Sequence, residues 1–194
     1  MDYGTFLSSK HIRVQPAGID YPEQRICEKA FDWQRAVVRY WLRLGRAGGF
    51  EDCGLGKSVQ ELSWAEALLL GGHAKRVLLL TPPAVAQQMV SEAEKFQIRV
   101  SVCNYERLHL LAPAEFDAVI LDESSILKSF MGKTKQALLA AFKNTRFKLA
   151  ASATPAPNDW LDLGNQADFL GIMRANEMLM RHGVPIAGNF LQQE

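Results

Sequence analysis

The sequence has little cysteine, little net charge and no long apolar run, and each of these shortages excludes a class of protein. Three cysteines among 194 residues, without a short spacing between them, predict neither a disulfide framework nor a zinc site. The four histidines also lack the spacing of metal ligands. Because the net charge is only +1, any nucleic-acid binding must come from a local patch of the surface.

The N-terminus lacks the basic and then apolar pattern of a secretory signal, and no stretch is apolar for long enough to cross a bilayer. We therefore expect a cytoplasmic protein that has no membrane partner. The composition that remains, with 48% hydrophobic and 22% charged residues, is typical of a globular domain. A chain of this length can bury a core without metals or disulfides.

The strongest local signal is the segment 51–58, which reads Glu-Asp-Cys-Gly-Leu-Gly-Lys-Ser. Gly54 and Gly56 allow backbone N–H groups to turn toward phosphate oxygens. The Lys57 ammonium can reach the β- and γ-phosphates of a nucleotide, and the Ser58 hydroxyl can coordinate Mg²⁺. The first position of such a loop is usually glycine and is glutamate here, so an ordinary glycine turn is the alternative interpretation of this segment alone.

Apolar runs of strand length alternate with helical patterns along the chain. We expect strands over residues 49–51, 77–81, 98–102, 116–121 and 147–151, and helices over residues 31–44, 57–70, 85–96, 134–142 and 158–171. Asp32 is the expected cap of the first of these helices. Apolar strands separated by helices indicate an α/β fold, in which a parallel sheet carries helices on both faces and binds its ligand at the carboxyl ends of the strands.

One of the expected strands ends on two adjacent acids, Asp122 and Glu123. Asp122 can hold Mg²⁺, while Glu123 can orient or deprotonate the water that attacks a phosphoanhydride. A solvated acid pair at a strand end is the alternative when these residues are considered by themselves. The glycine loop earlier in the chain, with helices between the two motifs, favours the functional interpretation.

Four motifs together resemble a known family. They lie at residues 31–34 (Phe-Asp-Trp-Gln), 52–58 (Asp-Cys-Gly-Leu-Gly-Lys-Ser), 122–125 (Asp-Glu-Ser-Ser) and 152–155 (Ser-Ala-Thr-Pro). Their order and rough spacing resemble superfamily 2 helicases, and most closely the Swi/Snf-like DNA translocases of phages and prophages, where Asp-Glu-Ser-Ser-x-Leu-Lys replaces Asp-Glu-Ala-His. The resemblance implies a RecA-like P-loop lobe over residues 31–173. Residues 1–30 would be a lead-in, and residues 174–194 a tail that begins a truncated connection.

The resemblance implies a role for each matching residue. It assigns ATP binding to Gln34, Gly54, Gly56, Lys57 and Ser58, Mg²⁺ binding to Ser58 and Asp122, and catalysis to Lys57, Asp122 and Glu123. Gln34 would read the adenine edge, whereas considered alone it would be an exposed helix glutamine. Ser152 and Thr154 would couple the nucleotide state to the nucleic acid, whereas alone they suggest a helix-entry turn with a hydroxyl cap.

Two further segments fall where the family contacts double-stranded DNA. The resemblance assigns this contact to Thr81, Pro82, Asn104 and Tyr105, because short polar groups at strand ends can bind sugar-phosphate without reading bases. Two loops with ordinary turn chemistry are the alternative. The chain before Asn104 is short for the family, so we expect a trimmed strand or DNA-facing loop. The trio Arg39, Arg43 and Arg46 has near-helical spacing and could touch phosphates, although a solvated helix face is the commoner role.

The family motor has a second lobe whose arginines reach the γ-phosphate, and this chain ends before such a lobe could begin. We therefore expect an ATP-binding lobe of a DNA-dependent ATPase, with little hydrolysis unless a second RecA-like lobe on another chain completes it. A non-catalytic module that binds nucleotide or DNA, as a truncated or regulatory remnant, is the alternative. A different P-loop enzyme such as a small kinase is a third hypothesis, but a kinase has no evident use for Gln34 or the motif at 152–155.

Overall fold

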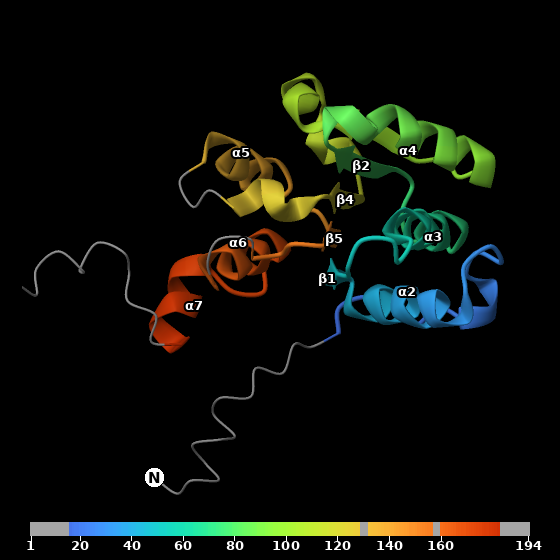
Figure 1. Cartoon of the computed structure of the whole chain (residues 1–194), viewed down its shortest axis with the longest axis horizontal. Coiled ribbons are helices and arrows are strands. Elements are labelled where there is room, and N and C mark those ends of the chain that lie inside the picture. The colour runs from blue at the N-terminus through green and yellow to red at the C-terminus, as the bar shows by residue number, and fades with distance from the viewer. Residues whose placement is uncertain (1–15, 129–131, 157–159, 183–194) are drawn as a thin grey trace, which may run out of the picture.

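A five-stranded parallel sheet forms the centre of the protein (Figure 1). The computed structural model describes residues 16–128, 132–156 and 160–182. The strands are β1 (Arg46–Phe50), β2 (Val77–Thr81), β3 (Ser101–Asn104), β4 (Ala118–Asp122) and β5 (Phe147–Ser152). Their order is β1-β5-β4-β2-β3, and each neighbouring pair is parallel, which confirms the predicted α/β fold.

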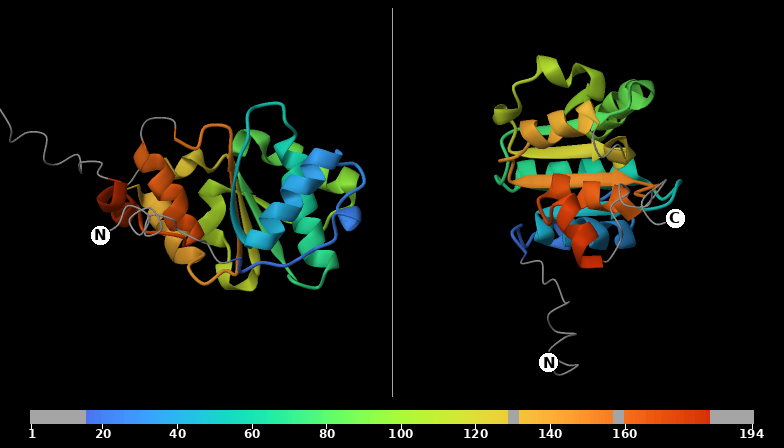
Figure 2. Two further views of the ribbon diagram at one scale, coloured as in Figure 1. Left: turned by 90° about the horizontal axis from the view of Figure 1, so that it is seen from below. Right: turned by 90° about the vertical axis from the view of Figure 1, so that its left-hand side faces the viewer.

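Helices cover both faces of this sheet (Figure 2). One face carries α2 (Asp32–Leu44), α3 (Lys57–Leu70) and α4 (Pro83–Phe96), and the other carries α5 (Lys133–Ala141), α6 (Trp160–Leu170) and α7 (Ala175–His182). Four short 3-10 turns complete the described chain: η1 (Glu23–Arg25), η2 (Tyr105–Leu110), η3 (Pro113–Glu115) and η4 (Ser124–Lys128). In the described part of the chain, no helix combines the length and apolarity needed to cross a membrane.

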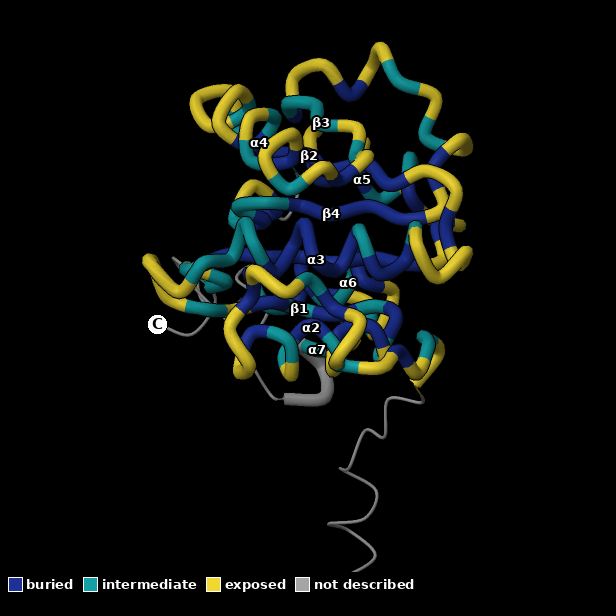
Figure 3. The backbone as a smooth tube through the Cα atoms, turned by 90° about the vertical axis from the view of Figure 1, so that its right-hand side faces the viewer, coloured by how far each residue is buried: buried dark blue, intermediate teal, exposed yellow. Residues whose placement is uncertain are grey.

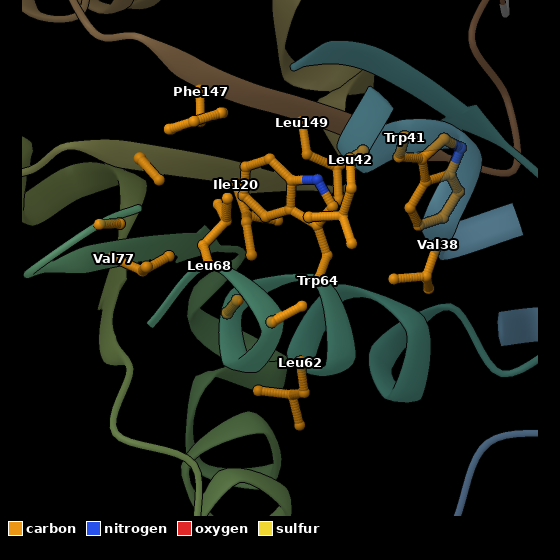
Figure 4. Close-up of a cluster of buried hydrophobic side chains, with 14 of the residues drawn as sticks. Val38, Trp41, Leu42, Leu62, Trp64, Leu68, Val77, Ile120, Phe147 and Leu149 are labelled. Atoms are coloured by element: carbon orange, nitrogen blue, oxygen red, sulfur yellow. The ribbon is translucent and has the colours of Figure 1, made fainter. Parts of the chain in front are cut away.

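The central strands β2, β4 and β5 are buried along most or all of their length (Figure 3). Alternate residues of these strands enter two separate cores, one on each face of the sheet. Ile120 and Leu149 point toward α2 and α3, where they pack with the buried Trp64 (Figure 4). Their strand neighbours Leu121 and Ala150 enter the second core, on the side of α5 and α6. Apolar burial on both faces fixes the sheet, so the carboxyl ends of the strands form one rigid edge.

Most element boundaries follow the prediction, and two differences have clear causes. α3 and β2 occupy the predicted ranges, because Gly71 ends α3 and Val77–Thr81 is apolar throughout. β3 lies three residues later than its predicted start, since its pairing with β2 begins only where Ser101 meets Leu78. β1 begins at Arg46 rather than residue 49, where it pairs with Lys148 of β5.

One local prediction at a helix end was wrong. Phe31 rather than Asp32 is the N-cap of α2, and its backbone N–H donates to the Gln34 side chain (2.9 Å). Within the predicted tail, α7 forms and packs against α6, with its buried Ala175 close to Gly164. The rest of that predicted tail, residues 183–194, and residues 1–15 of the predicted lead-in lie outside the described residues.

Candidate nucleotide-binding site

The predicted site residues converge because parallel strands deliver their carboxyl ends to one edge of the sheet. The glycine loop follows β1, and the acid pair and Ser152 lie at the ends of β4 and β5. A cavity of about 240 Å³ at this edge is lined by Ser58, Asp122 and Glu123, and by side chains of α4 that include Glu92. The sequence prediction that these segments meet is therefore confirmed as geometry.

The glycine loop uses glycine where the backbone requires it. Gly54 and Gly56 have φ of 83° and 74°, a left-handed conformation that residues with a Cβ rarely adopt. The surroundings of the two differ. A Cβ at Gly54 would meet nothing within 4 Å, whereas a Cβ at Gly56 would lie 2.6 Å from the Gln34 Nε2 atom. The loop is thus open to solvent at Gly54 and packed against α2 at Gly56.

Two glutamine side chains hold the loop from two helices. Gln34 of α2 is buried, and its Nε2 donates to the Leu55 carbonyl (2.9 Å). Gln60 of α3 donates to the same carbonyl (3.3 Å) and to the Glu51 carboxylate (2.6 Å). Gln34 is therefore not an exposed helix glutamine, and Glu51, at the position where such loops usually have glycine, anchors α3 to the loop.

Lys57 and Ser58 begin α3, and both side chains are half-buried. The Lys57 ammonium donates to the carbonyls of Glu51 (3.0 Å) and Asp52 (2.9 Å). An ammonium has three N–H donors, so one remains beyond these two bonds. Since the first turn of α3 has no acidic residue, the positive end of its helix dipole is not neutralised there.

The acid pair is held by hydroxyl groups. Asp122 accepts a hydrogen bond from Thr81 Oγ1 (2.6 Å), while Glu123 accepts one from Ser125 (2.6 Å) and one from Ser152 (2.8 Å). Burial raises the pKa of Asp122, although the Thr81 bond and Lys57 oppose the shift. A carboxylate that is costly to ionise where it lies is well placed to bind a cation.

Ser152 connects the last motif to the catalytic candidates. Its hydroxyl donates to Glu123, and it also accepts a hydrogen bond from the Thr154 backbone N–H (3.0 Å). Of the two predicted coupling residues, Ser152 therefore bonds directly to the Glu123 carboxylate, and Thr154 is connected to that carboxylate through Ser152. The helix-entry turn expected as the alternative is not what Ser152 forms, since it is the buried last residue of β5.

The four residues assigned to DNA contact face different ways. Thr81 and Tyr105 are buried, and their hydroxyls donate to the Asp122 side chain and to the Asp122 carbonyl (2.7 Å) respectively. Pro82 and Asn104 are half-buried, and the Asn104 side chain accepts a bond from the Arg107 N–H (3.0 Å). Any nucleic acid at this edge would thus meet backbone groups, Pro82 or the turn 104–107 rather than the two buried hydroxyls.

The arginine trio does not form one helical face. Arg46 lies in β1, where it donates to the carbonyls of Thr145 (3.1 Å) and Leu170 (3.4 Å), and Arg39 pairs with Asp20 (3.2 Å). α2 ends before Arg46 because Gly45 adopts a left-handed conformation. Neither Arg39 nor Arg46 is therefore the free phosphate contact that the spacing suggested.

Sequence reasoning missed Glu61, which lies one turn after Lys57 on α3. Glu61 is fully buried, and neither of its carboxyl oxygens has a hydrogen-bond partner among the described residues. Burial raises its pKa well above the usual value, and the neighbouring charge of Asp122 adds to the shift. The spacing of four residues from Lys57 was the signal that could have placed it on the same helical face.

The described residues contain no group of three or more His, Cys, Asp or Glu side chains that could hold a metal by themselves. A metal at this edge would instead use few protein ligands. Ser58 and Asp122 line the same cavity and offer the hard oxygen atoms that Mg²⁺ prefers. Mg²⁺ in nucleotide sites commonly takes its remaining ligands from phosphates and water.

No family model matches the chain. Among curated proteins, protein p41 of Acyrthosiphon pisum secondary endosymbiont phage 1 is 29% identical, over 71% of this chain and 38% of that protein. Protein CHROMATIN REMODELING 8 of Arabidopsis thaliana is 36% identical, over 41% of this chain and 7% of that protein.

Solved structures share the fold. The SWI2/SNF2 ATPase core of Sulfolobus solfataricus in complex with dsDNA matches with a TM-score of 0.73 at 18% identity, over 88% of this chain and 42% of that one. The UvsW helicase from Bacteriophage T4 matches with a TM-score of 0.60 at 15% identity, over 73% of this chain and 57% of that one. The chain spans less than two thirds of each of these proteins. By its fold, the chain resembles the SWI2/SNF2 ATPase core and the UvsW helicase, with a parallel sheet covered by helices on both faces.

Proposed function

We propose that this chain is the ATP-binding lobe of a DNA-dependent ATPase of translocase type, which binds ATP·Mg²⁺ at the glycine loop and double-stranded DNA at the carboxyl edge of the sheet. The observation that carries the proposal is the hydrogen bond from Ser152 to Glu123, beside a cavity that Ser58 and Asp122 also line. A solvated acid pair or an ordinary glycine turn would not bring these four side chains to one edge.

The residues present fit a nucleoside triphosphate. The open left-handed position at Gly54 and the uncompensated N-terminus of α3 suit a polyphosphate anion. Lys57 would hold the β- and γ-phosphates, and Ser58 and Asp122 would hold Mg²⁺. Gln34 retains one N–H and one acceptor lone pair beyond its two hydrogen bonds, so the adenine edge remains its proposed partner.

Catalysis would rest on positioning. Bound Mg²⁺ would neutralise charge on the β- and γ-phosphates. Glu123 would orient and deprotonate the attacking water, and Ser125 and Ser152 fix the direction of its carboxylate. Ser152 and Thr154 would report the state of this carboxylate to the nucleic-acid side of the edge.

The second lobe belongs to the same proposal. The chain covers 42% of the Sulfolobus solfataricus SWI2/SNF2 ATPase core, which was solved in complex with dsDNA. An arginine supplied across the cleft contributes about a thousand- to a hundred-thousand-fold in related phosphoryl-transfer enzymes. We propose that residues 31–173 are the lobe, between a lead-in and a connecting tail, and that a second RecA-like lobe, on the same or another chain in the cytoplasm, completes hydrolysis. A binding module without turnover is the second candidate, because no arginine is among the described residues that line the cavity.

The test measures ATP binding by calorimetry and ATP hydrolysis with and without duplex DNA. We expect the chain to bind ATP·Mg²⁺ with slow turnover, and Lys57→Ala to weaken binding roughly ten- to a hundredfold because charge-assisted hydrogen bonds are worth about 1.5–3 kcal/mol. Lys143→Ala, which removes an exposed lysine beyond α5, is the matched control and should change nothing.

Turnover distinguishes the candidates. Stimulation by DNA that Glu123→Gln abolishes, alone or after a second lobe is added, supports the ATPase. Tight ATP binding without turnover in every mixture would leave the binding module. Equal ATP affinity of the Lys57→Ala variant and the wild type would refute the nucleotide site altogether.

A further inference from the structure

Tyr105 occupies an unexpected position for a residue of a DNA-facing turn. It directly follows β3, yet only 7% of it is exposed, and its ring packs in the core beside Leu80 and Leu121. Its hydroxyl donates to the backbone carbonyl of Asp122 at 2.7 Å. Tyr105 therefore joins the segment after β3 to the end of β4.

The peptide that Tyr105 contacts is the one between Asp122 and Glu123. Glu123 itself has φ of 55°, and Gln97 is the only other residue besides glycine with a positive φ in the described chain. A residue with a Cβ is strained in the left-handed conformation, so this conformation persists only where the surroundings hold it.

The orientation of this peptide decides where the Glu123 side chain begins. A rotation of the 122–123 peptide would change φ of Glu123 and move its carboxylate away from Ser152 and Ser125. The hydroxyl of Tyr105 opposes that rotation from one side, while the rigid end of β4 opposes it from the other. The Tyr105 hydroxyl is thus placed to set the position of the proposed catalytic base.

The same turn offers groups to a ligand. The Asn104 side chain closes the turn by accepting the Arg107 N–H, and the side chains of Glu106 and Arg107 are exposed. A contact with sugar-phosphate at the turn would displace Tyr105 with it, because the two are adjacent in the chain. Thr81 makes a second link of this kind, from the end of β2 to the Asp122 side chain.

We infer that Tyr105 is a positioning residue that couples duplex DNA at the turn 104–107 to the Glu123 carboxylate through the 122–123 peptide. The inference rests on the proposed function, since it needs both ATP and DNA to bind. It assigns Tyr105 a role inside the protein in place of a direct contact with DNA. Loss of the hydroxyl alone should therefore weaken communication between the two ligands and leave each ligand's own contacts in place.

The test is the coupling factor, defined as the ratio of the duplex-DNA dissociation constants without and with ATP·Mg²⁺. Allosteric coupling is typically worth 5- to 150-fold, and it is reciprocal, so the effect of DNA on ATP affinity must give the same factor. In Tyr105→Phe we expect the factor to fall to near 1 while each ligand binds alone within about twofold of wild type. Tyr21→Phe removes the hydroxyl of another buried tyrosine and should retain the wild-type factor.

The possible outcomes distinguish a failure of the role of Tyr105 from a failure of the proposed function. An unchanged factor in Tyr105→Phe, or an equal loss in Tyr21→Phe, overturns the role of Tyr105 and leaves the proposed function intact. Failure of the wild-type chain to bind ATP or duplex DNA refutes the proposed function, and this inference falls with it. Hydrogen exchange on the wild type serves if the variant does not fold. Duplex DNA alone should then slow exchange at residues 123–125, and unaltered exchange there would overturn the inference.

Discussion

Replacing Gly56 by alanine tests how firmly the glycine loop is held by α2. The new Cβ would lie 2.6 Å from Gln34 Nε2, closer than carbon and nitrogen atoms can approach. Gln34 is buried and bonded at both ends of its amide, so it can move aside only by losing its bond to the Leu55 carbonyl. Gly54→Ala is the matched control, since it has the same left-handed backbone and nothing within 4 Å of its Cβ.

The two substitutions share one energy term and differ in another. Each forces a Cβ into the left-handed region, which costs roughly 1–2 kcal/mol. Gly56→Ala should lose, in addition, the net value of a buried hydrogen bond, about 0.5–1.5 kcal/mol, and up to about 3 kcal/mol if the Leu55 carbonyl were left without any partner. Gln60 still donates to that carbonyl, so we expect the lower figure.

Urea unfolding of the two alanine variants and of their combinations with Gln34→Ala measures these terms. In the wild-type background, Gly56→Ala should lower the free energy of unfolding by about 1 kcal/mol more than Gly54→Ala. In the Gln34→Ala background the two should become equal, since no side chain is then displaced, which is a double-mutant cycle between residues 34 and 56. If Gly56→Ala and Gly54→Ala destabilise the protein equally in both backgrounds, Gln34 does not hold the loop at Gly56 as we describe.

Two buried ionisable groups give further predictions. Glu61 has a raised pKa, so the folded state holds its proton above pH 4.5 where the unfolded state releases it, and stability falls as the pH rises. The free energy of unfolding of Glu61→Gln should therefore rise relative to that of the wild type by up to about 1.4 kcal/mol per pH unit above 4.5. Denaturant unfolding in EDTA measures this difference, and a difference that does not change with pH would contradict the assignment. Lys148, which donates to the Phe169 carbonyl (2.9 Å), has its pKa lowered to about 8 by burial and by Arg46. The unfolded state then binds more protons than the folded state between pH 8 and 10.5. The free energy of unfolding of the wild type should therefore rise relative to that of Lys148→Met by up to about 1.4 kcal/mol per pH unit in that window. Parallel pH profiles of the two proteins would rule this out.

Element boundaries were predicted correctly where a glycine ends a helix or where an apolar run has clear ends. Gly71 and the apolar run of β2 fixed two element boundaries without reference to the rest of the molecule. The start of β3 was not predicted correctly. Ile98 is apolar and buried but lies outside the strand, which begins where pairing with β2 begins. Strand ends are defined by a partner, and no single-sequence pattern contains the partner.

The sequence predicted which backbone segments meet at the site, but not where their side chains point. The carboxyl-end rule brought the glycine loop, the acid pair and Ser152 together, since parallel strands leave little freedom in where their ends lie. The directions of side chains were not accessible in this way. Whether the Tyr105 hydroxyl faces solvent or Asp122, and whether Glu61 is buried, depends on how α3 and the segment after β3 pack on the sheet.

The left-handed backbone of Glu123 has a consequence for how this sequence tolerates change. Glycine, and to a lesser degree asparagine, adopts that conformation more easily than glutamate, so either would relieve strain at residue 123. Selection for thermal stability alone would therefore tend to remove the carboxylate, whereas under the proposed function selection for turnover would retain it. If Glu123 is the catalytic base that we propose, stability and activity favour different residues at this position.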